Sequence, residues 1–154
     1  MSYLIDTCCI SELVKKKPDP NVVKWFADQD ELSMYLSVIT FGELKKGIEK
    51  LPDSKKKNEL NRWVKEDLKH RFKNRILNIN MEEVNKWGEI LAAADSKRSG
   101  EPRSEMDGRP LPTTDSLIAA TALVHGLSVV TRNSQDMEGS GVEVINPWNY
   151  EPNT

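Results

Sequence analysis

The sequence predicts an α/β fold with three layers, in which a central parallel sheet is flanked by helices. Short apolar segments typical of buried strands alternate along the chain with longer segments whose apolar residues recur at helical spacing. Strands that alternate with helices in this way usually pair in parallel. The length of 154 residues suits one domain, which we expect to span residues 1–154.

The first half of the chain is predicted to hold two strands among four helices. The strands are residues 3–6 and 32–38, and the helices are residues 8–16, 21–29, 40–50 and 54–72. Pro18 and Pro20 separate the first two helices. Thr40 and Glu43 have the spacing of a capping box at the start of the third helix, so Glu43 is either a helix cap or a metal ligand.

The second half is predicted to add three strands and two helices. The strands are residues 75–79, 128–131 and 142–145, and the helices are residues 81–99 and a segment beginning after Pro112. Thr113 or Thr114 is expected to cap that last helix, and Gly126 to end it. The segment 100–112 is expected to be a loop, Asp136 to lie in an acidic loop, and Trp148 to act as a packing lid.

Composition gives the chain an ordinary soluble character. Its mean hydropathy is −0.57, and it has no basic-then-apolar leader and no apolar run near the length of a membrane span. We therefore expect a cytoplasmic protein without a membrane segment. The two cysteines, Cys8 and Cys9, are adjacent and are expected to be reduced and partly buried.

Charge is distributed unevenly along the chain. Residues 1–80 carry a net charge of +4 and residues 81–154 a net charge of −6. A basic half and an acidic end can together hold metal ions and a polyanion. Most of these lysines are equally well explained as residues on solvent-exposed faces of helices, without any bound polyanion. His125 precedes Gly126 and is expected to complement the dipole at a helix C-terminus.

Four acids are expected to converge on one edge of the sheet. They lie at strand ends or at the helix starts that follow: Asp6, Glu43, Asp115 and Asp136. Carboxylates gathered in this way repel each other unless cations neutralise them, and oxygen ligands favour Mg²⁺ or Mn²⁺ over zinc. The alternative for Asp115 is an acid that complements the dipole of its own helix.

Four segments together resemble a known family. They are LIDTCCISEL at 4–13, SVITFGELKKGI at 37–48, DSLIAATALVHGLSVVTRN at 115–133 with Asp136 after it, and GVEVINPW at 141–148. In this order and spacing the chain resembles the PIN-domain ribonucleases, in particular the VapC and FitB-like toxins of type II toxin–antitoxin systems. The resemblance implies a three-layer PIN-like fold and a metal-dependent endoribonuclease.

The resemblance also implies a site. The catalytic and metal-binding residues are Asp6, Glu43, Asp115 and Asp136, holding one or two Mg²⁺ or Mn²⁺ ions, with Thr7, Thr131 and Asn133 in support. A metal-activated water would hydrolyse the RNA phosphodiester. Among the basic residues that follow Glu43, Lys45 and Lys46 are the expected RNA contacts.

The implied partners are the RNA substrate, a cognate antitoxin and a second copy of the chain in a homodimer. The antitoxin is expected to bind apolar residues of the first two helices: Ile10, Leu13, Val14, Val22, Trp25 and Phe26. The alternative is that these residues form the core between the helices.

Two departures from the family pattern leave a second function open. Cys8 stands where family members commonly carry Asn, which removes an amide that can orient a water or a carboxylate. Segment 100–112 is longer than usual. The alternative function is therefore a catalytically weakened PIN-like module that binds RNA or a protein. A phosphatase acting through Asp6 would need a second acid where Cys8 stands, and no G-x-G-x-x-G supports a dinucleotide enzyme.

Overall fold

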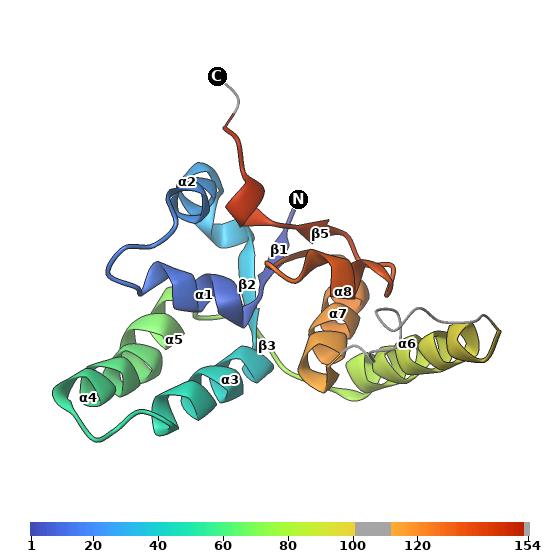
Figure 1. The fold of residues 1–154 in the computed structure, drawn as a ribbon, viewed down its shortest axis with the longest axis horizontal. Coiled ribbons are helices and arrows are strands. Elements are labelled where there is room, and N and C mark those ends of the chain that lie inside the picture. The colour runs from blue at the N-terminus through green and yellow to red at the C-terminus, as the bar shows by residue number, and fades with distance from the viewer. Residues whose placement is uncertain (101–111, 153–154) are drawn as a thin grey trace.

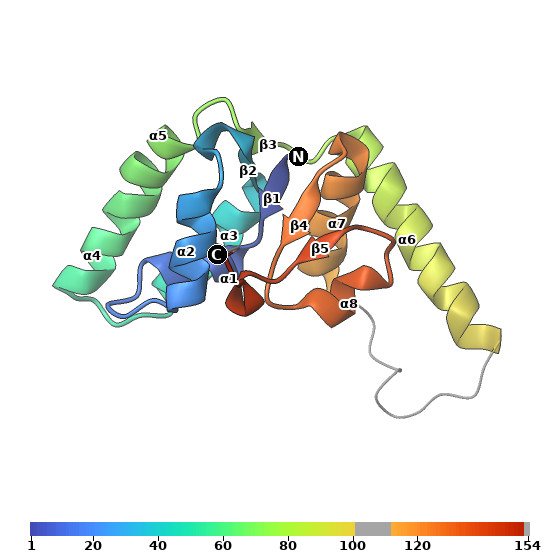
Figure 2. The ribbon, with the colours of Figure 1, turned by 90° about the horizontal axis from the view of Figure 1, so that it is seen from above.

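A five-stranded parallel sheet forms the centre of the molecule, as predicted. The computed structural model describes residues 1–100 and 112–152, apart from the side chains of residues 96–100 and 136. The sheet contains β1 (Tyr3–Ile5), β2 (Met34–Ser37), β3 (Ile76–Leu77), β4 (Ser128–Val130) and β5 (Val144–Ile145). Their order is β3-β2-β1-β4-β5 and every pairing is parallel, so β1 lies in the middle (Figures 1 and 2).

Helices connect the strands. Their bounds are α1 (Thr7–Leu13), α2 (Pro20–Asp28), α3 (Val38–Glu49), α4 (Lys55–Arg62), α5 (Lys69–Arg71), α6 (Met81–Gly100), α7 (Thr113–His125) and α8 (Ser134–Glu138). A π-helical segment, η2 (Trp63–Leu68), joins α4 to α5 without a break, which gives the predicted helix 54–72. Short 3₁₀ turns, η1 (Glu31–Ser33) and η3 (Pro147–Asn149), precede β2 and follow β5.

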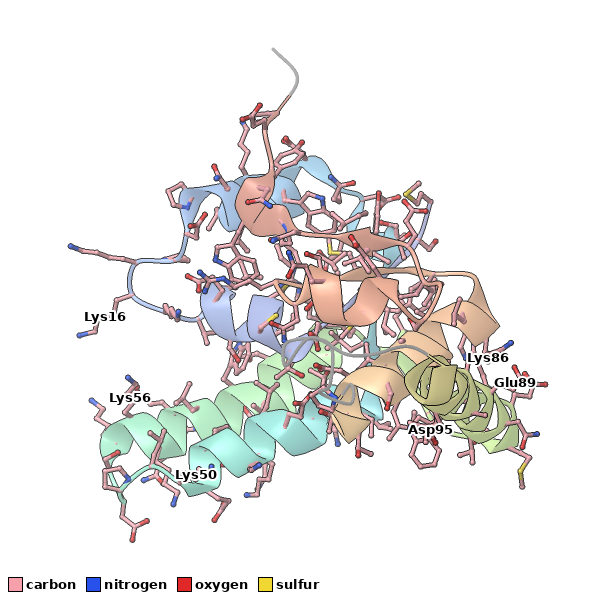
Figure 3. The ribbon with its side chains drawn as sticks, turned by 45° about the vertical axis from the view of Figure 1, so that its right-hand side comes forward. Lys16, Lys50, Lys56, Lys86, Glu89 and Asp95 are labelled. Carbon is pink, nitrogen blue, oxygen red and sulfur yellow. The ribbon has the colours of Figure 1, made fainter. Side chains whose placement is uncertain are left out.

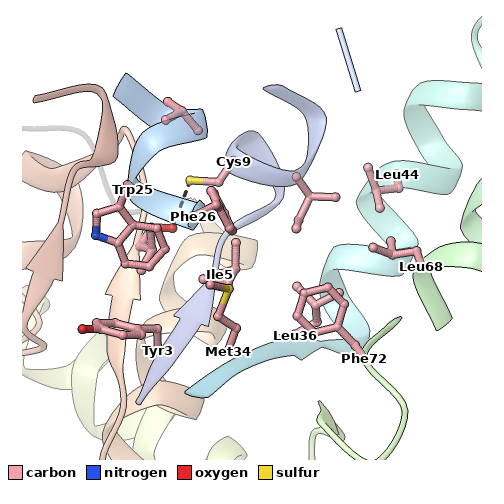
Figure 4. Packing of buried hydrophobic residues seen from close by; sticks show 13 residues of the cluster. Tyr3, Ile5, Cys9, Trp25, Phe26, Met34, Leu36, Leu44, Leu68 and Phe72 are labelled. Carbon is pink, nitrogen blue, oxygen red and sulfur yellow. Dashed lines mark hydrogen bonds between the residues drawn. The ribbon is translucent and has the colours of Figure 1, made fainter. Parts of the chain in front are cut away.

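Alternate residues of the strands face two separate hydrophobic clusters. Tyr3 and Ile5 of β1 pack with residues of α1 and α2, among them Cys9, Trp25 and Phe26 (Figure 4). Leu4, between them, packs in the other cluster with α7 residues such as Ile118 and Ala122. Because successive strand side chains point to opposite faces, both faces of the sheet are covered. The three-layer α/β prediction is confirmed.

Three local predictions about the helices are wrong. Helix α3 begins at Val38 with Ser37 as its N-cap, whose hydroxyl accepts a hydrogen bond from the Ile39 amide at 3.1 Å. Thr40 therefore lies inside the helix and forms no capping box with Glu43. Helix α7 begins after Pro112, and no side chain caps it. Asp136 lies in the short helix α8 rather than in a loop.

The end of α7 is as predicted. Gly126 has φ +67°, in the left-handed region, and its amide donates to the carbonyl of Ala122. A residue in this conformation terminates the helix and turns the chain into β4. Most of the predicted loop 100–112 lies outside the described residues. No helix in residues 1–100 or 112–152 is long and apolar enough to cross a membrane.

The apolar residues of the first two helices form the core. Ile10, Val22, Trp25 and Phe26 are all buried in the cluster beneath α1 and α2. For these four residues the alternative therefore holds: they form the core and do not line an exposed groove, while Leu13 is partly buried against the same cluster. Val14, by contrast, is 41% exposed, so the core alternative does not hold for it. It is the C-cap of α1, one residue beyond the end of the helix at Leu13.

Candidate active site at the carboxyl edge of the sheet

The topology places several polar residues at one edge of the sheet. Asp6 follows β1, Thr131 follows β4, and α3, which carries Glu43, follows β2. Parallel neighbours end at the same edge, so these residues come together there. Helix α7 runs back towards the opposite edge, where Gly126 turns it into β4, and its first turn therefore places Asp115 on the carboxyl side.

Asp6 is the most enclosed of these acids, with 4% of its surface exposed. It is the N-cap of α1 and accepts a hydrogen bond from the Thr7 amide at 2.8 Å on Oδ1. Its Oδ2 accepts from the Thr131 hydroxyl at 2.7 Å and lies 3.8 Å from Cys8 Sγ. These donors are neutral, and within the described part of the chain no cationic side chain bonds Asp6. A buried carboxylate in such surroundings fits a bound cation.

Thr7 connects Asp6 to Glu43. While its amide bonds Asp6, its hydroxyl donates to Glu43 Oε1 at 2.7 Å and lies 3.2 Å from the hydroxyl of Thr40. Glu43 therefore points towards the start of α1 and not towards the start of its own helix. This direction favours the interpretation of Glu43 as part of a site at the sheet edge.

Asp115 is 9% exposed in the first turn of α7. The neighbouring Ser116 fixes this turn, because its hydroxyl accepts from Trp87 Nε1 and donates to the Thr113 carbonyl, both at 2.9 Å. The position also suits the helix dipole, so both interpretations of Asp115 fit its placement.

The described acids share an edge but do not form a compact cluster. Among the described side chains, no group of three Asp, Glu, His or Cys residues lies close enough to hold a metal ion. The side chain of Asp136, the fourth predicted ligand, is not among the side chains that the structure describes. The backbone places that residue in α8, shortly after β4, at the same carboxyl edge of the sheet as Asp6.

Both cysteines are free, as predicted, and they differ in surroundings. Cys8 is half-buried beside the site, with Sγ 3.6 Å from the Thr131 hydroxyl. A hydrogen bond from Cys9 is the main cause that lowers the pKa of Cys8, while burial opposes it. Cys9 is buried and donates to the Val130 carbonyl at 3.3 Å. The pKa of Cys9 is strongly raised. The largest cause is a hydrogen bond to Cys8, and burial is the second.

Of the predicted supporting and RNA-binding residues, some contact the site and others lie on the exposed surface. Thr131 is buried and bonds Asp6, whereas Asn133 is exposed and reaches the site through its backbone amide, which donates to Thr131 Oγ1 at 3.1 Å. Lys45 and Lys46 are exposed on α3, and Lys45 forms an ion pair with Glu49 at 2.8 Å. Other lysines of this half of the molecule, such as Lys50 and Lys56, project into solvent (Figure 3).

Two residues near the site were missed by the sequence reasoning. Glu12 is buried and accepts from Lys15 Nζ at 2.8 Å and from the Asp19 amide at 3.0 Å, and these bonds lower its pKa. An acid between Ile10 and Leu13 was the available signal. Arg132 is exposed next to Thr131, and its sequence neighbours gave no indication of its contact with the distant Trp148.

This combination of fold and acidic edge defines the class of PIN domains. The model of the PIN domain family matches residues 3–137, and the chain belongs to this family. It is 35% identical over 145 residues to the plasmid stability protein StbB of Pseudomonas syringae pv. tomato, covering 94% of this chain and 97% of the relative.

Two further relatives are 32% identical over 145 residues, which is 94% of this chain. They are the VapC ribonuclease Y4jK of Sinorhizobium fredii, with 96% of its length covered, and the toxin FitB of Neisseria gonorrhoeae, with 97%. The crystal structure of FitAcB from Neisseria gonorrhoeae superposes with a TM-score of 0.82 at 32% identity, covering 96% of this chain and 99% of that one.

Proposed function

We propose that this single-domain chain is a metal-dependent endoribonuclease and the toxin of a toxin–antitoxin pair. The observation that carries the proposal is Asp6, a buried carboxylate surrounded by neutral donors and connected through Thr7 to Glu43. Its similarity to a VapC ribonuclease and to the toxin FitB, over nearly the whole length of each, supports a nuclease rather than another phosphate-transfer enzyme.

The residues that would hold Mg²⁺ or Mn²⁺ are Asp6, Glu43, Asp115 and Asp136. Oxygen donors of this kind suit both ions. When bound, the metal supplies a Lewis acid that makes water nucleophilic and offsets negative charge on a phosphodiester. No side chain at this edge then needs to act as the nucleophile.

The protein's own contribution is to hold the carboxylates in place. Thr131 and the Thr7 amide each fix one oxygen of Asp6, and the Thr7 hydroxyl fixes Glu43. Such second contacts keep a ligand carboxylate in one orientation, and their loss typically weakens metal affinity or activity about 10–100-fold. Lys46, exposed and one turn from Glu43, is the better candidate for a phosphate contact, since Lys45 is engaged by Glu49.

The proposed partners are RNA, a cognate antitoxin and a second copy of the chain. An acidic site is readily blocked by an arginine or lysine from another protein, because the cation pairs with the carboxylates. Because the proposed substrate is cellular RNA, we also propose a cytoplasmic location.

A catalytically weakened RNA- or protein-binding module remains the second candidate. The observation that favours it is Cys8, which contacts Asp6 Oδ2 where an amide would supply a stronger hydrogen bond. This candidate shares the fold and the partners but predicts no metal-dependent cleavage.

A cleavage assay on single-stranded RNA separates the two functions. We expect the purified chain to cut RNA with Mg²⁺ or Mn²⁺ and to stop in EDTA. Asp6→Asn and Asp115→Asn should lower the rate on the order of 100-fold or more while leaving the circular dichroism unchanged. Asp67→Asn, which removes an exposed acid of η2, is the matched control. Equal cleavage by the Asp6→Asn and Asp67→Asn proteins would exclude the proposed nuclease site.

A further inference from the structure

Arg132 and Trp148 extend the carboxyl edge of the sheet beyond the acids. Arg132 comes two residues after β4, and Trp148 lies in η3, which follows β5. Strands β4 and β5 are parallel neighbours, and β1 with Asp6 pairs on the other side of β4. The order along the edge is therefore Asp6, then Arg132, then Trp148, so that the arginine stands beside the acidic site.

The indole ring of Trp148 holds the arginine in place. The guanidinium carbon of Arg132 lies 5.1 Å from the ring centroid, within the range of a cation–π contact. Trp148 is itself anchored: its carbonyl accepts from Asn21 Nδ2 at 2.8 Å, and its amide donates to Asn146 Oδ1 at 3.0 Å. The ring also packs against the core cluster that contains Tyr3 and Trp25. A rigid ring thus restrains an otherwise flexible side chain.

The guanidinium is available to a ligand. Arg132 is exposed, and no hydrogen bond or ion pair to its side chain occurs in the part of the chain that the structure describes. Arg71 and Arg75 are different, because Arg71 pairs with Glu31 and Arg75 donates to the carbonyl of Met34. Stacking occupies the face of a guanidinium and leaves its N–H groups free for two oxygens of a phosphate.

Arg132 also lies close to the site through its backbone. Thr131, the preceding residue, donates to Asp6 Oδ2 at 2.7 Å and lies 3.6 Å from Cys8 Sγ. The acids of this edge would repel the phosphates of a bound strand wherever no cation stands nearby. A fixed positive charge beside the acids offsets that repulsion for a phosphate next to the one being cut.

We propose that Arg132, positioned by Trp148, binds a backbone phosphate of the RNA substrate adjacent to the scissile bond. This inference rests on the proposed ribonuclease function. It makes Arg132 a substrate-binding residue and Trp148 a positioning residue, and it predicts recognition of the strand's backbone with no preference for a particular base. The competing role is structural, in which Arg132 only supports η3 and the nearby Glu12, whose pKa it helps to lower.

The test compares Arg132→Gln and Arg132→Lys with Lys73→Gln. Lys73 is an exposed cation in the turn before β3, at the opposite edge of the sheet, and serves as the control. Steady-state cleavage of a short single-stranded RNA gives kcat and KM. Binding of the same RNA to each variant in an Asp6→Asn background gives Kd as a function of salt.

We expect Arg132→Gln to raise KM and Kd roughly three- to tenfold, with kcat within about twofold of the parent protein. The slope of log Kd against log salt should fall by about 0.7, the value for one phosphate contact with a single strand. Arg132→Lys should recover the salt slope and only part of the affinity, because lysine keeps the charge without the planar contacts. Lys73→Gln should change neither quantity.

Variants of Trp148 test the positioning role. Trp148→Phe keeps a weaker aromatic face, and Trp148→Leu keeps apolar volume without one. We expect KM to rise in that order, and thermal unfolding identifies any variant that fails to fold. KM and a salt slope for Arg132→Gln equal to those of Lys73→Gln, in a parent that cleaves RNA, would overturn this inference alone. A parent that neither cleaves nor binds RNA would overturn the proposed function with it.

Discussion

Thr7 is the single residue on which the geometry of the site depends most. Its amide bonds Asp6 and its hydroxyl bonds Glu43, so one residue fixes two carboxylates that come from different strand ends. The hydroxyl contact joins α1 to α3, which are separated in sequence by α2 and β2. Thr7 therefore determines the relative orientation of two proposed ligands.

The first prediction concerns this hydroxyl. Thr7→Val keeps the shape of the side chain and removes the donor to Glu43, whereas Thr7→Ser keeps the donor. We expect Thr7→Val to lower metal-dependent cleavage by about 10–100-fold and stability by about 1 kcal/mol. Cleavage rates and urea unfolding curves measure the two effects. Equal activity of the Val and Ser variants would show that Glu43 does not need this contact.

At the scale of elements, the strands and most helix bounds were predictable, whereas the residues that cap α3 and α7 were not. The alternation of apolar strands and helices predicted parallel pairing, and with it the place of Asp6 at the carboxyl edge, but not the order of the strands. The start of α3 was misjudged because Ser37 and Thr40 are both good caps, and only the backbone decides which one the helix uses. The contact between Thr7 and Glu43 depends on how α1 and α3 pack, and this packing cannot be predicted from a local sequence pattern.

The exposed valines show the same limit. Val14, Val23 and Val84 match helical spacing, yet each is 40–41% exposed. Apolar positions on these helices cover more than the one face that packs against the rest of the protein, so periodicity alone overestimates burial. The contact between Arg132 and Trp148 could not be predicted from the sequence either. It joins two turns that only the parallel pairing of β4 and β5 brings together.

Two glycines, one inside α3 and one that ends α7, lead to opposite predictions. Gly126 has φ +67°, so Gly126→Ala forces a side chain into the left-handed region and should cost about 1–2 kcal/mol. Gly47 lies inside α3 with nothing within 4 Å of an added Cβ, so Gly47→Ala should stabilise the protein by about 0.5–1 kcal/mol. Thermal unfolding of both variants checks the signs. A stabilised Gly126→Ala protein would contradict the role of this residue as the end of α7.

At the scale of the whole molecule, acid stability depends on carboxylates that hold elements together. Glu12 joins α1 to the loop before α2, and the hydrogen bond from Lys15 is the first cause that lowers its pKa, followed by the Asp19 amide. Glu83 has a lowered pKa as well: burial raises it, and hydrogen bonds from His125 and the Asn80 amide outweigh that effect. A folded-state pKa below the unfolded value stabilises the protein above the unfolded pKa.

The third prediction follows from that sign. The stability that Glu12 contributes is present above about pH 4.3 and is lost as the pH falls through its lower folded pKa. We expect Glu12→Gln to melt at a lower temperature than the parent at pH 7, and the difference to shrink as the pH falls below 4. Glu89→Gln, which removes an exposed acid paired with Lys86 on α6, is the control (Figure 3). A difference that stays constant from pH 7 to pH 3 would contradict the assignment.

The central claim is that the carboxylates at the carboxyl edge of the sheet bind a divalent cation. Titration of Mn²⁺ into the purified protein, with free Mn²⁺ followed by electron paramagnetic resonance, tests it without depending on any RNA. We expect the parent and Asp67→Asn to bind Mn²⁺ alike, and Asp6→Asn to bind at least about tenfold more weakly, because it removes the charge of the least exposed acid described at this edge. Equal Mn²⁺ affinity of the parent and Asp6→Asn, or no binding by either, would contradict the account.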